Sequence, residues 1–204
     1  MNSAWLAAGT GLVTGAALII AIGAQNAYVL RQGILREHVL PIVIVCALSD
    51  ALLIAAGVAG MGALVAAAPA LVTGIRWVGA AFLVTYGLLA ARRALTPERL
   101  EAGGIGSSTP LRTAILTSLA LTWLNPHVYL DTLVFLGSIA TSQGSHNWAF
   151  GVGAASASVL WFTGLGYGAR LLAPLFAKPI AWRMLDGLIA VVMVTLGVLL
   201  ITSH

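Results

Sequence analysis

The sequence predicts an all-α integral membrane protein with six transmembrane helices, arranged as two inverted repeats of three helices whose first helices are broken. Three observations lead to this prediction. Hydrophobic residues make up 60% of the 204 residues and charged residues only 8%, whereas soluble domains carry about 25% charge. Long apolar runs recur along the chain, and short patterns of the first half return in the second half. The lipid bilayer is therefore the expected surrounding of almost the whole chain.

Six apolar stretches are long enough to cross the hydrocarbon of a bilayer, which takes about 20 helical residues. Charged residues, glycines and prolines separate these stretches. The first stretch lacks the basic start and the cleavage site of a secretory signal, so we expect it to remain as the first helix. The expected spans are residues 5–30, 39–62, 70–91, 112–139, 148–170 and 182–202.

The third and sixth spans carry charged residues near their beginnings, namely Arg76, Arg183 and Asp186. We expect these side chains to reach the headgroup region by snorkelling. A chain with five spans is the alternative, because charged residues near their beginnings make these two spans the weakest of the six.

Basic residues gather in alternate connections between the spans. Nine of the ten lysines and arginines fall in connections one, three and five, and Arg76 alone falls on the opposite side. Since cationic connections stay in the cytoplasm, we expect these three connections inside and both termini outside. This orientation accounts for the net charge of +4, so we expect no nucleic acid as a partner.

Two patterns of the first half recur in the second half, in the same order and at corresponding spans. The matching elements are residues 84–89 with 194–199, and the pair Ser49 and Gly57 with the pair Ser156 and Gly164. Because each repeat has three spans, the second copy must cross the membrane upside down, as in many secondary transporters.

The repeats predict a single transmembrane domain over residues 1–204. Repeat one covers 1–91 and repeat two covers 112–204. The cytoplasmic connection 92–111 between them contains glycines and charged residues, and we expect it to act as a flexible hinge.

The first span of each repeat contains a helix break. Gly23 weakens the first span, and Pro126 removes a backbone donor from the fourth, which we expect to kink or unwind near Trp123 and Leu124. Broken helices at corresponding positions are typical of transporter sites, because freed carbonyl groups can coordinate a substrate away from water.

Polar and aromatic side chains surround both breaks. Gln25, Asn26 and Asn125 are candidates for hydrogen bonds to a substrate, and the alternative is that these amides hold helices together. Trp123 and Tyr129 are candidates for attracting an ammonium or guanidinium group, with packing or lipid contact as the alternative.

Two carboxylates lie inside predicted spans. Asp50 lies about 16 Å along the second span, near the middle of the hydrocarbon, and Asp131 lies beyond the kink of the fourth. Charges at such depth are rare and mark polar pathways. If both carboxylates face one cavity, either one is protonated or a cation lies between them. The alternative is a carboxylate bonded to backbone donors, or to Arg31 or Arg76 near a membrane face.

Other chemistries find little support in the sequence. His127 and Asp131 share a helical face, but two ligands are too few for a metal, so we expect His127 to bond or to handle protons. Cys46 is the single cysteine and is expected to be a packing residue. No P-loop, HExxH or GxSxG motif occurs, so we expect neither an enzyme nor a cofactor.

Residues 23–33 (GAQNAYVLRQG) and 124–132 (LNPHVYLDT) resemble the lysine exporter family of bacterial inner-membrane amino acid exporters, specifically its lysine and arginine exporting branch. The resemblance covers essentially the whole chain. Related homoserine and threonine exporters carry a Pro-Gly-Pro element in the first break, where this chain has Ala-Gln-Asn. The resemblance thus implies a multi-pass inner-membrane exporter of basic amino acids, with functional roles for Asp50 and Asp131.

The cargo that this resemblance implies agrees with the acidic membrane residues. Moving the +1 charge of lysine or arginine outward costs about 2.3 kcal/mol per 100 mV of inside-negative potential, and exchange for an entering proton cancels that charge movement. We expect an ionised aspartate to hold the cation and its protonation to release it. Export of neutral amino acids or other small cations, an uncoupled channel and a passive scaffold are the alternatives. Small residues such as Gly57 and Gly151 would allow a homo-oligomer.

Overall fold

The computed structural model describes residues 2–20, 23–62, 67–95 and 109–202, and all regular elements among them are helical. This confirms the all-α prediction. The α-helices are α1 (Asn2–Ile19), α2 (Ala24–Leu35), α3 (Val39–Val58), α5 (Pro69–Leu95), α7 (Leu111–Trp123), α8 (Pro126–Tyr129), α9 (Gly137–Ser142), α10 (Asn147–Gly168) and α11 (Pro179–Thr202). The shorter elements are the π-helix η1 (Leu130–Leu136) and the 3₁₀ turns η2 (Gly144–His146), η3 (Ala169–Leu172) and η4 (Leu175–Ala177).

Four helical stretches within the described residues are long and apolar enough to cross a membrane. They are Val39–Val58, Val72–Leu95, Gly144–Leu172 and Ile180–Thr202. Helices α1 and α2 form a fifth if they count as one span, although they are bent by 83° relative to each other. The fourth predicted span corresponds to 111–142, which runs as the shorter pieces α7, α8, η1 and α9.

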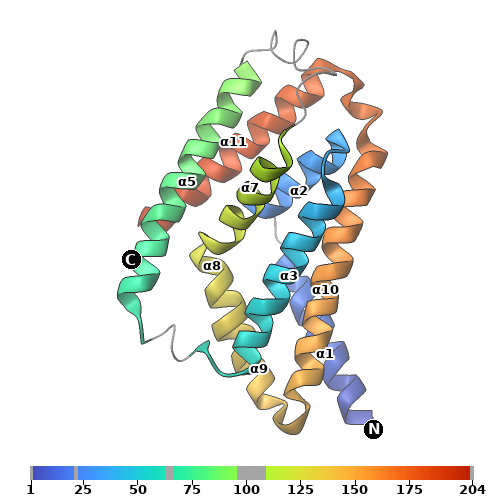
Figure 1. Cartoon of the computed structure of the whole chain (residues 1–204), viewed down its shortest axis with the longest axis vertical. Helices are drawn as coiled ribbons and strands as arrows, with labels where there is room; N and C mark the ends of the chain where they lie inside the picture. Colours follow the sequence, from blue (N-terminus) through green and yellow to red (C-terminus); the bar gives the residue numbers. More distant parts are fainter. Residues whose placement is uncertain (1, 21–22, 63–66, 96–108, 203–204) are drawn as a thin grey trace.

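The helices pack as two long pairs with the broken helices between them (Figure 1). Helices α5 and α11 run side by side along one flank, and α1 packs against α10 on the other. Helix α3 packs against α10, α7 and η1. The larger buried cluster joins side chains of α2, α3, α5, α7, α10 and α11. Both halves of the chain therefore share one interior.

Helices α5 and α11 meet through a reciprocal contact of small residues. A methyl group placed on Gly87 would lie 2.8 Å from Val194 Cγ2, and one placed on Gly197 would lie 2.7 Å from Val84 Cγ2. Gly87 and Gly197, like Val84 and Val194, occupy matching positions of the pattern that recurs in the two halves. Each half thus presents the same residues to the other at this contact.

Asp186 is buried inside the protein and does not extend outward as a snorkelling side chain would. Its carboxylate is fully buried in α11, where arginines from two other helices contact it. Arg183 is exposed, and its Nε donates a hydrogen bond to the carbonyl of Ala94 at 3.0 Å. The sequence of the sixth span does not reveal that Asp186 is buried, because its arginine partners belong to other helices.

Helix α5 extends into the predicted central connection. Helix α5 continues to Leu95 and contains Arg92 and Arg93, which we had expected in the connection 92–111. Basic residues in the last turn favour continuation of the helix, because they interact well with the negative end of its dipole. The predicted hinge itself falls on residues 96–108, outside the described residues.

Substitution of Gly57 tests how closely α3 approaches η1. A methyl group at Gly57 would lie 2.3 Å from the carbonyl oxygen of Thr132, so Gly57→Ala is expected to lower the free energy of unfolding by about 1–3 kcal/mol. The measurement is denaturant unfolding in mixed micelles. Gly164→Ala is the matched control, because it adds the same methyl group to a helix where nothing lies within 4 Å. Equal stability of the two variants would contradict this close packing.

Candidate functional site

The first helix break lies between α1 and α2. Gly23 occupies the N-cap of α2 in an extended conformation, with φ −124° and ψ 171°. Asn26 Nδ2 donates to the carbonyl of Ile19 at 2.7 Å, and Asn26 Oδ1 accepts from Trp161 Nε1 at 3.2 Å. The Asn26 amide thus satisfies a carbonyl at the end of α1 and links the break to α10.

The second break separates α7, which ends at Trp123, from α8, which begins at Pro126. This is where the proline predicted a kink. Asn125 Oδ1 accepts a hydrogen bond from the backbone N–H of His127 at 3.1 Å and so caps α8. The hydroxyl of Tyr129 donates to the Trp123 carbonyl at 2.7 Å. Side chains therefore replace backbone bonds that the proline removes.

The indole of Trp123 connects the second break to α3. Its Nε1 donates to Ser49 Oγ at 3.1 Å, and its ring meets that of Tyr129 edge-on, with centroids 6.5 Å apart. In this conformation both aromatic residues support the break, and neither lines the cavity described below.

Asp131 lies on a π-helical segment that the sequence did not predict. Helix α8 widens into η1 directly before Asp131. Thr132 Oγ1 donates to the carbonyl of Val128 at 2.6 Å, within this widened region. Such π-helical turns are rare and frequently occur at functional sites, because they change the direction of side chains that a regular helix would present elsewhere.

A cavity of about 230 Å³ lies between the two breaks and α3. This is below the 300–1,000 Å³ that is typical of sites for drug-sized molecules, and so suits a small metabolite. Both halves of the chain contribute to its walls. Predicted site residues that line it are Gly23, Gln25, Asn26, Asp50, Asn125, His127 and Asp131, whereas Trp123, Pro126 and Tyr129 do not.

Asp50 and Asp131 face this one cavity without a basic partner. Asp50 is 6% exposed, and its Oδ2 accepts a hydrogen bond from Ser158 Oγ at 2.6 Å. Asp131 is half-buried and has no hydrogen-bond partner among the described residues. Neither carboxylate forms an ion pair in the described part of the chain. Two acidic groups without compensation in one enclosure favour a bound cation or proton.

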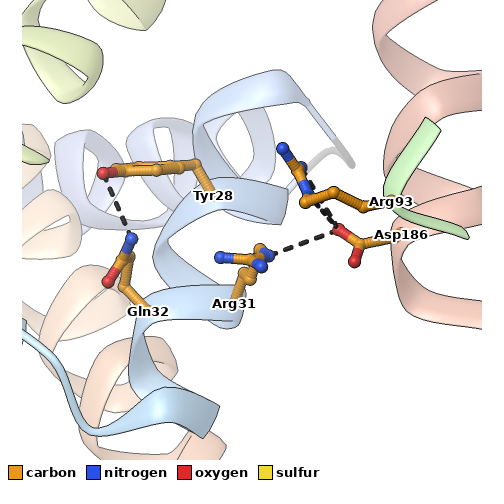
Figure 2. A network of polar contacts seen from close by, with 5 residues as sticks. All are labelled: Tyr28, Arg31, Gln32, Arg93 and Asp186. Carbon is orange, nitrogen blue, oxygen red and sulfur yellow. Dashed lines mark hydrogen bonds and ion pairs between the residues drawn. The ribbon is translucent and has the colours of Figure 1, made fainter. Parts of the chain in front are cut away.

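Arg31, considered above as a partner for these aspartates, binds elsewhere. Its Nε lies 3.3 Å from Asp186 Oδ1 (Figure 2). No lysine or arginine of the described residues lines the cavity, and exposed His127 is the remaining group there that can carry a positive charge. No group of three metal-ligating side chains occurs in the described ranges.

The remaining walls of the cavity are mostly apolar. Leu18, Ile54, Leu136, Phe162 and Leu196 are among the residues that line it. Apolar walls lower the local dielectric constant and so strengthen the attraction between a carboxylate and a cation. Phe162 was not predicted to line a site, because a long apolar helix does not distinguish inward-facing from lipid-facing phenylalanines.

Ser158 is a second residue of the site that its sequence pattern does not single out. It is fully buried on α10 and donates to Asp50 on α3. A serine among small residues of an apolar helix gives no signal for this role, because its partner lies 108 positions away in the chain.

Most of the chain matches a single protein family. The family described as LysE type translocator matches residues 16–204. A Mycobacterium tuberculosis protein named as a candidate amino-acid transporter is 49% identical over 186 residues, which cover 91% of this chain and 92% of the relative. No solved structure matches the chain.

Two further relatives have names that state a cargo. The lysine exporter LysE of Corynebacterium efficiens is 37% identical, and the match covers 94% of this chain and 96% of the relative. The arginine exporter protein ArgO of Salmonella schwarzengrund is 44% identical, and the match covers 90% of this chain and 87% of the relative.

A double-mutant cycle tests the bond between Ser158 and Asp50. Ser158→Ala leaves a buried carboxylate without its donor, so we expect a coupling free energy of about 1–3 kcal/mol with Asp50→Leu, measured as unfolding in mixed micelles. Ser156→Ala is the control, because its hydroxyl bonds the Val152 carbonyl of its own helix. Additive effects of Ser158→Ala and Asp50→Leu would show that the two side chains do not interact.

Proposed function

The chain belongs to the LysE type translocator family, and on this premise we propose that it exports L-arginine and L-lysine across the bacterial inner membrane in exchange for protons. Members of this family are multi-pass membrane transporters and not enzymes. The observation that carries the proposal is the cavity that Asp50 and Asp131 share, which is lined by both carboxylates and by no lysine or arginine of the described residues. The names of two relatives state the same class of cargo.

The cavity suits a cation that carries an aliphatic chain. In the proposal the guanidinium or ammonium group of the cargo lies between Asp50 and Asp131, and the apolar walls contact its methylene groups. Gln25 supplies a further donor, because its Nε2 is buried and has no hydrogen-bond partner among the described residues. The oxygens of Asn26 and Asn125 already accept other bonds, so these two residues contribute mainly by shaping the breaks.

Coupling to protons follows from competition for one acidic site. Ionised Asp50 and Asp131 attract the cationic cargo, and two like charges in one enclosure also favour uptake of a proton when the cargo is absent. Proton entry in exchange for cargo leaves no net charge movement. This avoids the cost of about 2.3 kcal/mol per 100 mV that export of a cation would otherwise meet. The pH gradient then drives export.

Alternating access requires two halves that move relative to each other around the cavity. We propose six spans in two inverted repeats, with 111–142 as the fourth span and the basic connections in the cytoplasm. The reciprocal contact of Gly87 and Gly197 supports this symmetry, because residues related by a two-fold axis contact each other in both directions. The helix breaks at corresponding positions add further support.

Neutralising either cavity aspartate tests the cargo site. In proteoliposomes, Asp50→Asn and Asp131→Asn are expected to reduce counterflow of labelled arginine by about 30-fold or more, the effect of losing roughly 2 kcal/mol from a buried charge contact. Glu37→Gln is the matched control, since Glu37 lies outside the cavity and accepts from the Thr109 backbone. Arginine counterflow that survives both aspartate substitutions would remove these residues from the cargo site.

An imposed pH gradient tests the coupling. Vesicles are loaded with labelled arginine, and only transporters with their cytoplasmic face toward the lumen are followed. Acidifying the outer medium should then accelerate efflux, because protons enter in exchange for cargo. A protonophore with the membrane potential clamped should abolish the acceleration. Efflux with the same rate at every gradient would indicate an uncoupled channel.

A further inference from the structure

A third aspartate, Asp186, lies buried away from the cavity. Positive charges outnumber the negative charge around it, whereas carboxylates predominate in the cavity. Asp186 of α11 is fully buried, and both Arg31 of α2 and Arg93 of α5 bind its Oδ1 atom (Figure 2). The distances are 3.3 Å from Arg31 Nε and 3.2 Å from both Nε and Nη2 of Arg93. Two cations thus share one carboxylate oxygen, while Asp186 Oδ2 is buried and has no hydrogen-bond partner among the described residues.

This ion cluster of Arg31, Arg93 and Asp186 lies on the basic side of the cavity along three helices. On α5, Leu83 lines the cavity and Arg93 lies ten residues closer to the basic end. On α11, Leu196 lines the cavity and Asp186 lies ten residues closer to that end. Ten helical residues correspond to about 15 Å. The basic end is the top of Figure 1, where α5 ends and α11 begins.

On α2 the ion cluster follows the cavity in the same direction. Gln25 lines the cavity in the first turn of α2, and Arg31 lies six residues later, or about 9 Å along the helix. The ion cluster therefore lies between the cavity and the basic end on all three of these helices.

Aromatic side chains fill the space beside the ion cluster. Arg93 lies over the ring of Tyr86 at 5.7 Å, and Tyr86 meets Tyr28 edge-on with ring centroids 6.2 Å apart. Gln32 Nε2 donates to the Tyr28 hydroxyl at 3.3 Å (Figure 2). Arg31 lies 6.0 Å from the ring of Trp182. The ion cluster is therefore in contact with aromatic rings from α2, α5 and α11 through these pairwise contacts.

The ion cluster joins the two halves of the chain. Arg31 and Arg93 come from residues 1–95 and Asp186 from 111–202. Breaking a buried ion pair leaves uncompensated charge, yet a buried pair adds little stability beyond that of apolar packing. Such contacts are suited to a junction that has two alternative states. In a junction that never opens, leucines in place of the charged residues would give as much stability.

We propose that Arg31, Arg93 and Asp186 form the cytoplasmic gate, which closes the cavity toward the cytoplasm in this conformation and separates before cargo enters. The inference rests on the proposed function for its assignment of the basic side to the cytoplasm and for alternating access. It adds three residues outside the cargo site to the transport cycle.

Cys46 is a built-in reporter of the gate. It is the single cysteine of the chain, it is fully buried, and its Sγ lies 3.1 Å from Ser118 Oγ. It lies one helical turn from Asp50 on the same face of α3, in the direction of the basic end. Opening of a cytoplasmic path to Asp50 should expose this thiol to reagents from the cytoplasmic side.

The experiment measures alkylation of Cys46 by a membrane-impermeant maleimide in inside-out and in right-side-out membrane vesicles. Asp186→Asn and Arg93→Gln are expected to accelerate labelling by about tenfold in inside-out vesicles only, because loss of one charged partner shifts the equilibrium toward the open state. Arg93→Lys keeps the charge and should label close to the wild-type rate. Arg170→Gln removes an exposed basic charge from the same side and is the matched control.

Unchanged labelling in both variants would overturn the gate and leave the ion cluster as a structural link. Faster labelling from both sides, or from the outside only, would overturn it as well. If Asp186→Asn fails to insert, Arg93→Gln decides, because Asp186 then keeps Arg31 and the Arg93 side chain is already 35% exposed. Labelling needs no cargo, so the gate and the proposed export of basic amino acids can fail separately.

Discussion

A carboxylate surrounded by apolar helices must be stabilised by whatever faces it, and this constraint organises the whole molecule around Asp50 and Asp131. One oxygen of Asp50 accepts a hydrogen bond from Ser158, and Asp131 has no such partner among the described residues. Both line the same cavity. An enclosure with this charge is stable only when it holds a proton or a cation. In the proposed function, the cargo or a proton supplies this positive charge.

The cavity in turn depends on broken helices, whose backbone groups must be satisfied away from water. Asn26 caps the end of α1, Asn125 caps the start of α8, and Tyr129 binds the carbonyl at the end of α7. These three side chains perform the structural work that allows an irregular backbone inside a membrane protein. Residues of both breaks then line the cavity beside the two aspartates.

Much of this arrangement follows from the sequence. Asp50 and Asp131 are each the single charged residue in a long apolar run, which identifies them as candidates. Pro126 predicts the position of the second break. The remainder depends on contacts between distant residues. Ser158 looks like any small residue of an apolar helix, and the buried state of Asp186 requires arginines from two other helices. The π-helical turn at Asp131 is a change in backbone hydrogen bonding, which hydropathy does not report.

Aspartate occurs in two different settings in this protein, an ion cluster and a cavity, and its partners differ between them. Two arginines bind Asp186, whereas no lysine or arginine of the described residues forms an ion pair with Asp50 or Asp131. The most direct test of the central claim is an electron cryomicroscopy structure with bound arginine. We expect the guanidinium group within about 4 Å of the carboxylates of both Asp50 and Asp131, the distance of an ion pair. Arginine bound elsewhere, with the cavity between these two residues unoccupied, would contradict the account.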